Sequence, residues 1–211
     1  MTGGEASDYT SANRSTYDRI ASRYAANRSR AATTNDVGFA DLQRAFLDTL
    51  QPGGLIADLG CGPAIDGARL AGAGFRVVGI DLSHGMLSIA SKALDGLVAQ
   101  GDLRAIPLAD GRLDGIWCAA ALLHVPEPDT DKVLQEFRRT VRRSGSLALV
   151  TALGEGSRFE TVPYAAEEQR WFVYRNAERL RDQVFAAGFR VSMQNVISGN
   201  RVWYALLAEA K

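Results

Sequence analysis

The sequence predicts a parallel α/β sheet covered by helices on both faces. Short apolar runs alternate with helical patterns between residues 55 and 153, which is typical of such sheets. Two runs of alternating polarity close the chain, so an antiparallel pair is expected at its end. The 211 residues, 46% of them hydrophobic, suit one large domain with a buried core. We expect that domain over residues 13–211, after a mobile tail over residues 1–12 rich in Gly, Ser and Thr.

Two helices are expected before the first strand. In the first, Ser15 and Asp18 have the spacing of a capping box. Four of its residues recur at helical spacing, namely Tyr17, Ile20, Ala21 and Tyr24. The second helix carries one apolar face, formed by Phe39, Leu42, Phe46, Leu47 and Leu50. The sequence Gln51-Pro52-Gly53-Gly54 is expected to end it.

Strands and helices then alternate along the chain. The expected strands are 55–59, 75–80, 96–100, 113–122 and 146–153, and the expected helices between them begin near Pro63 or span 83–94 and 131–141. A last helix over 177–187 stops at Gly188. The runs 189–197 and 201–210, with Ser-Gly-Asn between them, predict the terminal hairpin.

Composition excludes several classes of protein. The formal charge is zero, with 24 basic and 24 acidic side chains, so no global basic field steers a polyanion. Cys61 and Cys118 lie in or beside apolar runs and are expected as reduced core residues. With His84 and His124 the only histidines and no CxxC, no metal site is expected. The chain has no apolar leader and no apolar run near the ~20 residues of a membrane helix, so we expect a cytoplasmic protein.

The glycine-rich turn after strand 55–59 is the first candidate ligand site. Gly60 and Gly62 let the backbone approach a ligand closely, although a tight turn without a ligand would also explain them. The dinucleotide fingerprint fails because Ile65 stands where a small residue is needed. A phosphate-binding Walker loop also fails, because Ala68-Arg69 replaces the lysine and hydroxyl residue.

Two acidic residues follow at the ends of the next two strands. Asp81 could accept hydrogen bonds from two ribose hydroxyls, or it could cap the following helix. Asp102 could accept a hydrogen bond from an exocyclic amine such as that of adenine, or it could be a solvated turn residue. Glycines and two acids at successive strand ends suit a nucleoside without phosphate, because no lysine or arginine lies at the glycine turn.

On these residues the chain resembles the class I S-adenosylmethionine-dependent methyltransferases with a methyltransferase-11-type domain. The likeness lies in ADLGCGPA, VVGIDLSHGML, GDLRAIPLADGRLDGIWCAAALLHVP and VLQEFRRTVRRSGSLALV, and covers roughly residues 17–150. It implies a Rossmann-like, seven-stranded, mostly parallel sheet with helices on both faces and a C-terminal antiparallel hairpin. The chain departs from the family at Ala64, where a third glycine is frequent, and at Arg143-Ser144-Gly145, where Pro-Gly-Gly is usual.

The resemblance also implies that the cofactor is S-adenosylmethionine. Asp58, Gly60 and Gly62 would line its methionine part, with Asp58 and the Ala119 carbonyl near the ammonium group. Asp81 would hold the ribose, while Asp102 and the Leu103 N–H would meet adenine. The complete cofactor-binding set is Tyr17, Tyr24, Asp58, Gly60, Cys61, Gly62, Asp81, Leu82, Met86, Asp102, Leu103 and Ala119. For Tyr17 and Tyr24, ordinary helix packing is an equal alternative.

The expected reaction is methyl transfer to a hydroxyl or amine of a small molecule. His124 is the candidate general base, and the alternative is a histidine that orders the loop before Pro126. The aromatic segment between the fifth strand and the last helix is expected to bind the acceptor through Tyr164, Arg170, Trp171 and Tyr174, with Arg170 available to an anionic group. That segment could instead pack on the sheet. A tRNA methyltransferase and a non-catalytic cofactor-binding module are the alternative functions.

Overall fold

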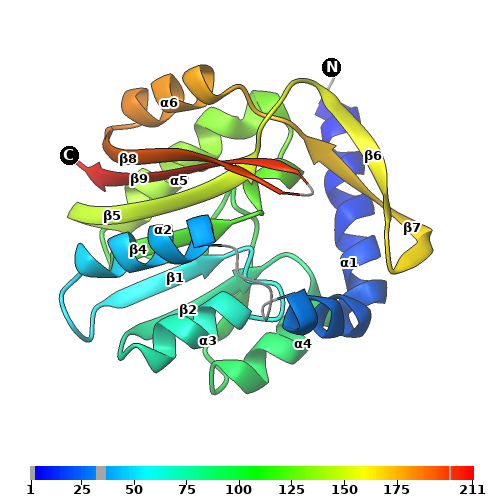
Figure 1. Cartoon of the computed structure of the whole chain (residues 1–211), viewed down its shortest axis with the longest axis horizontal. Coiled ribbons are helices and arrows are strands. Elements are labelled where there is room, and N and C mark those ends of the chain that lie inside the picture. The colour runs from blue at the N-terminus through cyan, green and yellow to red at the C-terminus, as the bar shows by residue number, and fades with distance from the viewer. Residues whose placement is uncertain (1–2, 32–36, 200) are drawn as a thin grey trace.

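The computed structural model describes residues 3–31, 37–199 and 201–211. A sheet of seven strands has the order β3-β2-β1-β4-β5-β9-β8, which confirms the predicted fold class (Figure 1). Its strands are β1 (Leu55–Leu59), β2 (Arg76–Asp81), β3 (Val98–Gln100), β4 (Leu113–Ala119), β5 (Val141–Ala152), β8 (Phe189–Ser198) and β9 (Val202–Ala210). β1 to β5 are parallel, and β9 pairs antiparallel with both β5 and β8.

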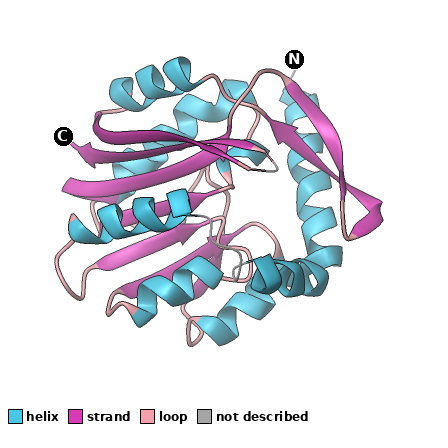
Figure 2. Ribbon diagram, in the orientation of Figure 1, coloured by secondary structure: helices cyan, strands magenta, loops and turns pink. Residues whose placement is uncertain are grey.

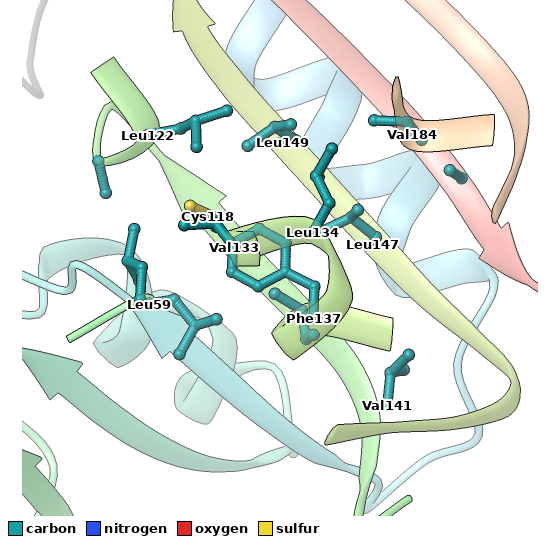
Figure 3. Packing of buried hydrophobic residues seen from close by; sticks show 14 of the residues in the cluster. Leu59, Cys118, Leu122, Val133, Leu134, Phe137, Val141, Leu147, Leu149 and Val184 are labelled. Carbon is teal, nitrogen blue, oxygen red and sulfur yellow. The ribbon is translucent and has the colours of Figure 1, made fainter. Parts of the chain in front are cut away.

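Helices cover both faces of the sheet because successive strand residues point to opposite sides (Figure 2). Ile56 packs with α2 (Val37–Asp48), α3 (Ile65–Gly72) and α4 (His84–Ala93). On the other face of the same strand, Ala57 and Leu59 pack with α5 (Thr130–Thr140) and α6 (Ala177–Ala186). Figure 3 shows the second cluster, in which Phe137 lies among apolar side chains of β1, β4 and β5. The sheet is therefore a rigid base whose strand ends can hold a site.

The N-terminal segment differs from its prediction. Residues 3–12, expected as a tail, belong to α1 (Gly3–Ala31), while residues 1–2 lie outside the described part of the chain. Tertiary contacts explain the difference: the Tyr9 ring stacks on Trp171 with 4.5 Å between centroids. The Asn13 side chain accepts from the Trp171 N–H at 2.7 Å and donates to its carbonyl at 2.9 Å. These contacts hold a segment whose composition alone does not favour a helix.

Three element boundaries also needed correction. Pro63 precedes α3 rather than starting it, because Ala64 has a left-handed φ of 58°. This backbone geometry also explains why glycine suits the position of Ala64. The fourth strand ends at Ala119, and a short 3-10 helix, η1 (Leu122–His124), follows it. β5 begins at Val141, so Arg143-Ser144-Gly145 lies within a strand that is irregular at Ser144, where φ is 57°.

The aromatic segment after β5 forms a separate antiparallel hairpin of β6 (Ser157–Val162) and β7 (Ala165–Val173). β7 lies beside α1, and both stand at the carboxyl ends of the sheet strands (Figure 1). Arg19 of α1 pairs with Glu168 of β7 through both guanidinium nitrogens, at 2.6 and 2.7 Å. α1 and the hairpin thus form a second layer opposite the strand ends. No helix within the described ranges is long and apolar enough to span a membrane.

Candidate active site

A cavity of about 660 Å³ lies between the strand ends and the layer formed by α1 and β7. This volume is within the range of small-molecule sites. Its floor comes from the strand ends, and its roof from α1, β7 and β9. Of the predicted site residues, those that line it are Tyr17, Tyr24, Asp58, Gly60, Cys61, Gly62, Asp81, Leu82, Met86, Asp102, Leu103, Ala119, His124, Tyr164 and Arg170. Trp171 and Tyr174 do not.

The glycine turn is shaped by its own backbone as well as by the cavity. Gly60 has a φ of 69°, and a Cβ added there would lie 2.2 Å from the Ala121 Cβ. The turn needs glycine at this position whether or not a ligand is present. Gly62 has a φ of 54°, but an added Cβ would meet only the Tyr24 ring, at 3.7 Å. Gly62 is therefore the glycine that leaves its side of the turn open to the cavity.

Asp81 is held rigidly at the end of β2. Its Oδ2 accepts from the Gly62 N–H and its Oδ1 from the Ser83 N–H, both at 2.8 Å. Burial raises the pKa of Asp81, while these hydrogen bonds oppose the increase. The helix-capping role belongs to Ser83 instead, whose Oγ accepts from the Met86 N–H at 3.1 Å. The carboxylate is thus fixed beside the glycine turn and lines the cavity.

Asp58 at the end of β1 is a buried acid with an unsatisfied oxygen. Its side chain lines the cavity, and its Oδ2 makes no hydrogen bond with any described residue. Burial raises the pKa of Asp58 well above its usual range, and the negative charge of Asp66 adds to the increase. A buried carboxyl group of this kind requires a donor or a cation to ionise. Asp58 is therefore suited to an ammonium group.

Asp102, in the turn after β3, already pairs with a neighbouring arginine. Its Oδ1 accepts from the N–H and Nε of Arg104, and its Oδ2 accepts from Nη2 at 2.6 Å. Burial raises the pKa of Asp102, but the hydrogen bonds from Arg104 outweigh it and leave the pKa below its usual value. Arg104 also pairs with Asp129 at 2.8 Å. The carboxylate stays ionised and is fixed at the end of β3.

His124 uses both ring nitrogens. Nδ1 lies 2.9 Å from the Trp171 carbonyl oxygen, and Nε2 lies 2.7 Å from the Tyr17 hydroxyl. A carbonyl only accepts hydrogen bonds, so Nδ1 carries the proton; otherwise two lone pairs would face each other. Burial lowers the pKa of His124 to about 4, so the ring is neutral near pH 7. Nε2 then accepts from Tyr17, an arrangement that favours the ordering role over that of a base touching the acceptor.

Strand alternation explains why Trp171 misses the cavity, and Tyr174 lies beyond the end of β7. Arg170 and Phe172 line it, whereas Trp171 points to the other face of β7 and stacks on Tyr9. Beyond the end of β7, the Tyr174 hydroxyl hydrogen-bonds to Glu160 and Arg201. The aromatic segment was predicted as a single binding surface, but its residues divide between two faces.

Several lining residues were not predicted from the sequence. These residues are Asn13, Arg28, Arg104, Phe172, Arg201 and Trp203. Alternation could have revealed Phe172 beside Arg170, and Trp203 beside Arg201, once each run was read as a strand. Arg104 lies two residues after Asp102, a spacing at which the two side chains can pair in a turn. No sequence signal connects Asn13 to this site.

Comparison with known proteins supports one interpretation of this geometry. The family model described as a methyltransferase domain matches residues 56–145. These residues form a class I S-adenosylmethionine-dependent methyltransferase domain. They include the glycine turn, Asp58, Asp81 and Asp102. Ligands of open α/β sheets bind beyond the carboxyl ends of the strands, where these residues lie.

Two curated proteins show the range of relatives of this methyltransferase domain. The chain is 32% identical over 165 residues to a demethylmenaquinone methyltransferase of Beutenbergia cavernae, covering 75% of this chain and 62% of the relative. It is 37% identical over 120 residues to a malonyl-[acyl-carrier protein] O-methyltransferase of Pseudescherichia vulneris, covering 56% and 46%. The chain spans between 32% and 62% of the length of curated relatives that it matches.

A solved structure resembles the whole fold of the methyltransferase domain. The 1,6-didemethyltoxoflavin-N1-methyltransferase of Burkholderia thailandensis, bound to 1,6-didemethyltoxoflavin and S-adenosylhomocysteine, has a TM-score of 0.73 and 16% identity. The similarity covers 98% of this chain and 90% of the other. The cofactor of the family is S-adenosylmethionine. The orphaned Oδ2 of Asp58 and the open side of Gly62 fit a ligand with a cationic amino acid part.

Proposed function

We propose that the chain transfers a methyl group from S-adenosylmethionine to a small molecule bound beneath α1 and the β6–β7 hairpin. One observation carries this proposal: a single cavity joins the acids at the strand ends to a roof of aromatic and arginine side chains. The floor suits the cofactor, and the roof suits an acceptor. A cavity roofed by two elements favours a small molecule over a folded RNA, and the zero net charge agrees with this.

The floor residues have distinct proposed roles toward the cofactor. Asp58 and the Ala119 carbonyl would accept from the ammonium group, while Asp81 would accept from the two ribose hydroxyls. Asp102 and the Leu103 N–H would meet the adenine edge. Leu82, Met86, Cys61 and Tyr24 would supply its apolar contacts, since all of them line the same cavity. The fixed positions of Asp81 and Asp102 support these roles, because both acids are oriented before any ligand binds.

The chemistry requires positioning more than reactive side chains. When bound, the cofactor would supply a methyl group on a sulfonium centre, which a nucleophile of the acceptor would attack in line as the thioether leaves. The protein contributes by aligning acceptor and methyl and by excluding water. Tyr17 and His124 have a positioning role in this proposal. The Tyr17 hydroxyl donates to Nε2 of His124, and Nδ1 of the same imidazole donates to the Trp171 carbonyl of β7. Phe172, Tyr164 and Arg170 would contact the acceptor in place of Trp171 and Tyr174.

Isotope transfer tests the proposed function. Labelled S-adenosylmethionine would be incubated with the protein, with bulk tRNA in one arm and a panel of small hydroxyl- and amine-bearing metabolites in the other. We expect label in small molecules and none in tRNA. Efficient labelling of tRNA alone would contradict the proposal, while cofactor binding without labelling in any arm would favour a non-catalytic module. Phe172→Ala should lower the rate with any acceptor found, and Val173→Ala, on the opposite strand face, is its control.

A further inference from the structure

We infer that the methyl acceptor binds as an anion whose charge is held by Arg170. The inference rests on the proposed function and names the chemical class of its acceptor: a small, delocalised oxyanion, either a carboxylate or a phenolate, on an apolar or aromatic body. Arg170 projects from β7 into the cavity, on the same strand face as Phe172. Its guanidinium lies over the Phe172 ring, with Cζ 5.2 Å from the ring centroid.

Within the described part of the chain, Arg170 lacks the carboxylate partner that three other arginines with buried or half-buried side chains possess. Arg104 pairs with Asp102, Arg175 with Glu127 and Arg201 with Glu160. Among the residues that the structure describes, no carboxylate forms an ion pair with Arg170, and its Nε is buried without a hydrogen-bond partner. A guanidinium taken out of water needs an anion or several acceptors to offset the loss of hydration.

The groups that surround Arg170 are neutral. The Tyr17 hydroxyl accepts a side-chain hydrogen bond from Arg170. Tyr17, Tyr24 and Tyr164 would carry a charge only if they ionised, and burial raises the pKa of all three. The Tyr164 hydroxyl is itself buried and has no hydrogen-bond partner within the described chain. His124 is neutral and already bonded. Arg201 lies over the same Phe172 ring, but it is already paired with Glu160. An oxyanion beside Arg170 would therefore meet a positive charge that no carboxylate of the described residues pairs with, and an unused hydroxyl donor.

The cavity separates charges in a way that fits this assignment. Asp58, Asp81 and Asp102 lie on its floor, whereas Arg170 lies on its roof. The cofactor's own carboxylate needs a different partner, for which Arg28 is suited. Arg28 also lines the cavity, and its positive charge acts to lower the pKa of Tyr24. The Tyr24 ring lies against the glycine turn near Gly62. Planar oxyanions match the two-pronged geometry of a guanidinium, and the Phe172 ring offers an adjacent apolar surface.

The test compares charged and neutral probes of the same shape. Calorimetric titrations with 1-naphthoate and with its neutral isostere 1-naphthamide would be run on the wild type, with and without S-adenosylhomocysteine. A third titration with 4-nitrophenol, below and above its ionisation, separates phenolate from carboxylate as the source of charge. The variants are Arg170→Gln, Arg170→Lys and, as a matched loss of one arginine in the same cavity, Arg28→Gln.

We expect the wild type to prefer at least one anion over its neutral form by roughly tenfold or more, the effect typical of a hydrogen bond to a charged group. Arg170→Gln should remove this preference, and Arg170→Lys should retain part of it. Arg28→Gln should keep the preference but bind S-adenosylhomocysteine more weakly. No anion preference in the wild type, or an Arg170→Gln variant that loses cofactor affinity and keeps the preference, would overturn the inference. Failure of the wild type to bind S-adenosylhomocysteine would instead contradict the proposed function.

Discussion

His124 illustrates at the residue scale how two hydrogen bonds determine a protonation state. The ring must stay neutral to donate to Trp171 and accept from Tyr17. Its pKa is lowered to about 4 by burial, whereas an unfolded histidine titrates near 6.5. Between these two values the unfolded chain binds a proton that the folded chain does not. The stability supplied by the neutral ring is therefore complete above about pH 6.5 and is lost as the pH falls toward about 4.

A pH series tests this assignment. Denaturant unfolding should show a fall of up to about 3 kcal/mol in the free energy of unfolding between about pH 6.5 and about pH 4 that is attributable to His124. In His124→Gln this component should disappear, and the variant should also be less stable at pH 7 by about 1–3 kcal/mol because Tyr17 and Trp171 lose a partner. His84→Gln is the control, because His84 is exposed. Equal pH profiles for wild type and His124→Gln would contradict the assignment.

Asp81 has two functions that one substitution affects together. Asp81→Ala should weaken the binding of S-adenosylmethionine roughly 10- to 150-fold, because two hydrogen bonds to a charged group are lost. It should also lower stability by about 1–3 kcal/mol, since the N–H groups of Gly62 and Ser83 lose their acceptor. Calorimetry measures the first effect and denaturant unfolding the second. Cofactor affinity that stays within a factor of about two would exclude Asp81 from the ribose site.

Asp58 predicts a coupling between cofactor binding and proton release. Burial raises its pKa well above the usual range, and an ammonium group beside it would favour the ionised form. Binding should therefore release protons, and affinity should rise with pH until Asp58 is ionised in the free protein. Titration calorimetry in buffers of different ionisation enthalpy measures the released protons. Asp58→Asn should abolish the release, and a buffer-independent enthalpy in the wild type would contradict the prediction.

At the scale of secondary-structure elements, Arg175 joins the hairpin to the loop that carries His124. Its buried guanidinium donates to Glu127, to the Thr130 hydroxyl and to the carbonyls of Leu122 and Val125. Arg175→Met should cost about 3–5 kcal/mol of stability, because Glu127 and two carbonyls lose their donor in a buried setting. Arg179→Met is the matched control, since Arg179 also pairs with Glu127 but is exposed. Similar unfolding midpoints for the two variants would refute this role.

The sheet and its covering helices could be predicted from the sequence, and the second layer could not. Apolar runs and glycine turns determine β1 to β5 locally, since each strand is buried by its own composition. The first turns of α1 depend on contacts with β7, more than 150 residues away, and such contacts leave no local pattern. The β6–β7 hairpin was not predicted, because consecutive apolar and aromatic residues from Trp171 to Tyr174 hide the alternation at the end of β7.

At the scale of the whole molecule, ligand binding should raise thermal stability selectively. S-adenosylmethionine or S-adenosylhomocysteine at about one hundred times its dissociation constant should add about 2.7 kcal/mol. For a chain of this size that corresponds to roughly 5–10 °C in melting temperature. NAD should give no shift, because Ile65 occupies the position that dinucleotide sites reserve for a small residue. Stabilisation by NAD and by neither methionine compound would exclude the proposed cofactor.

The candidate site divides between the part that sequence predicts and the part that it does not. Parallel strands end at one edge of a sheet, so the order of strands along the chain predicts that Asp58, Asp81 and Asp102 lie together. Their partners could not be predicted in this way: Arg104 donates to both carboxylate oxygens of Asp102, and Tyr17 occupies the nitrogen that His124 would need as a base. The chemistry of a side chain depends on which neighbours fold against it, and those neighbours come from α1, β7 and β9.

The pairing of α1 with β7 has a consequence for how the chain acquires its shape. Asn13 and Trp171 are 158 residues apart, and Thr16 and Gln169 are 153 apart, whereas Asp18 reaches Ser83 across only 65. Contacts between distant residues form late, because a long loop must close before they are made. During synthesis α1 leaves the ribosome before β7, so it cannot make these contacts until β7 follows. We therefore expect the acids of the floor to stay open to water until β7 has been made, with enclosure among the last events in the folding of this domain.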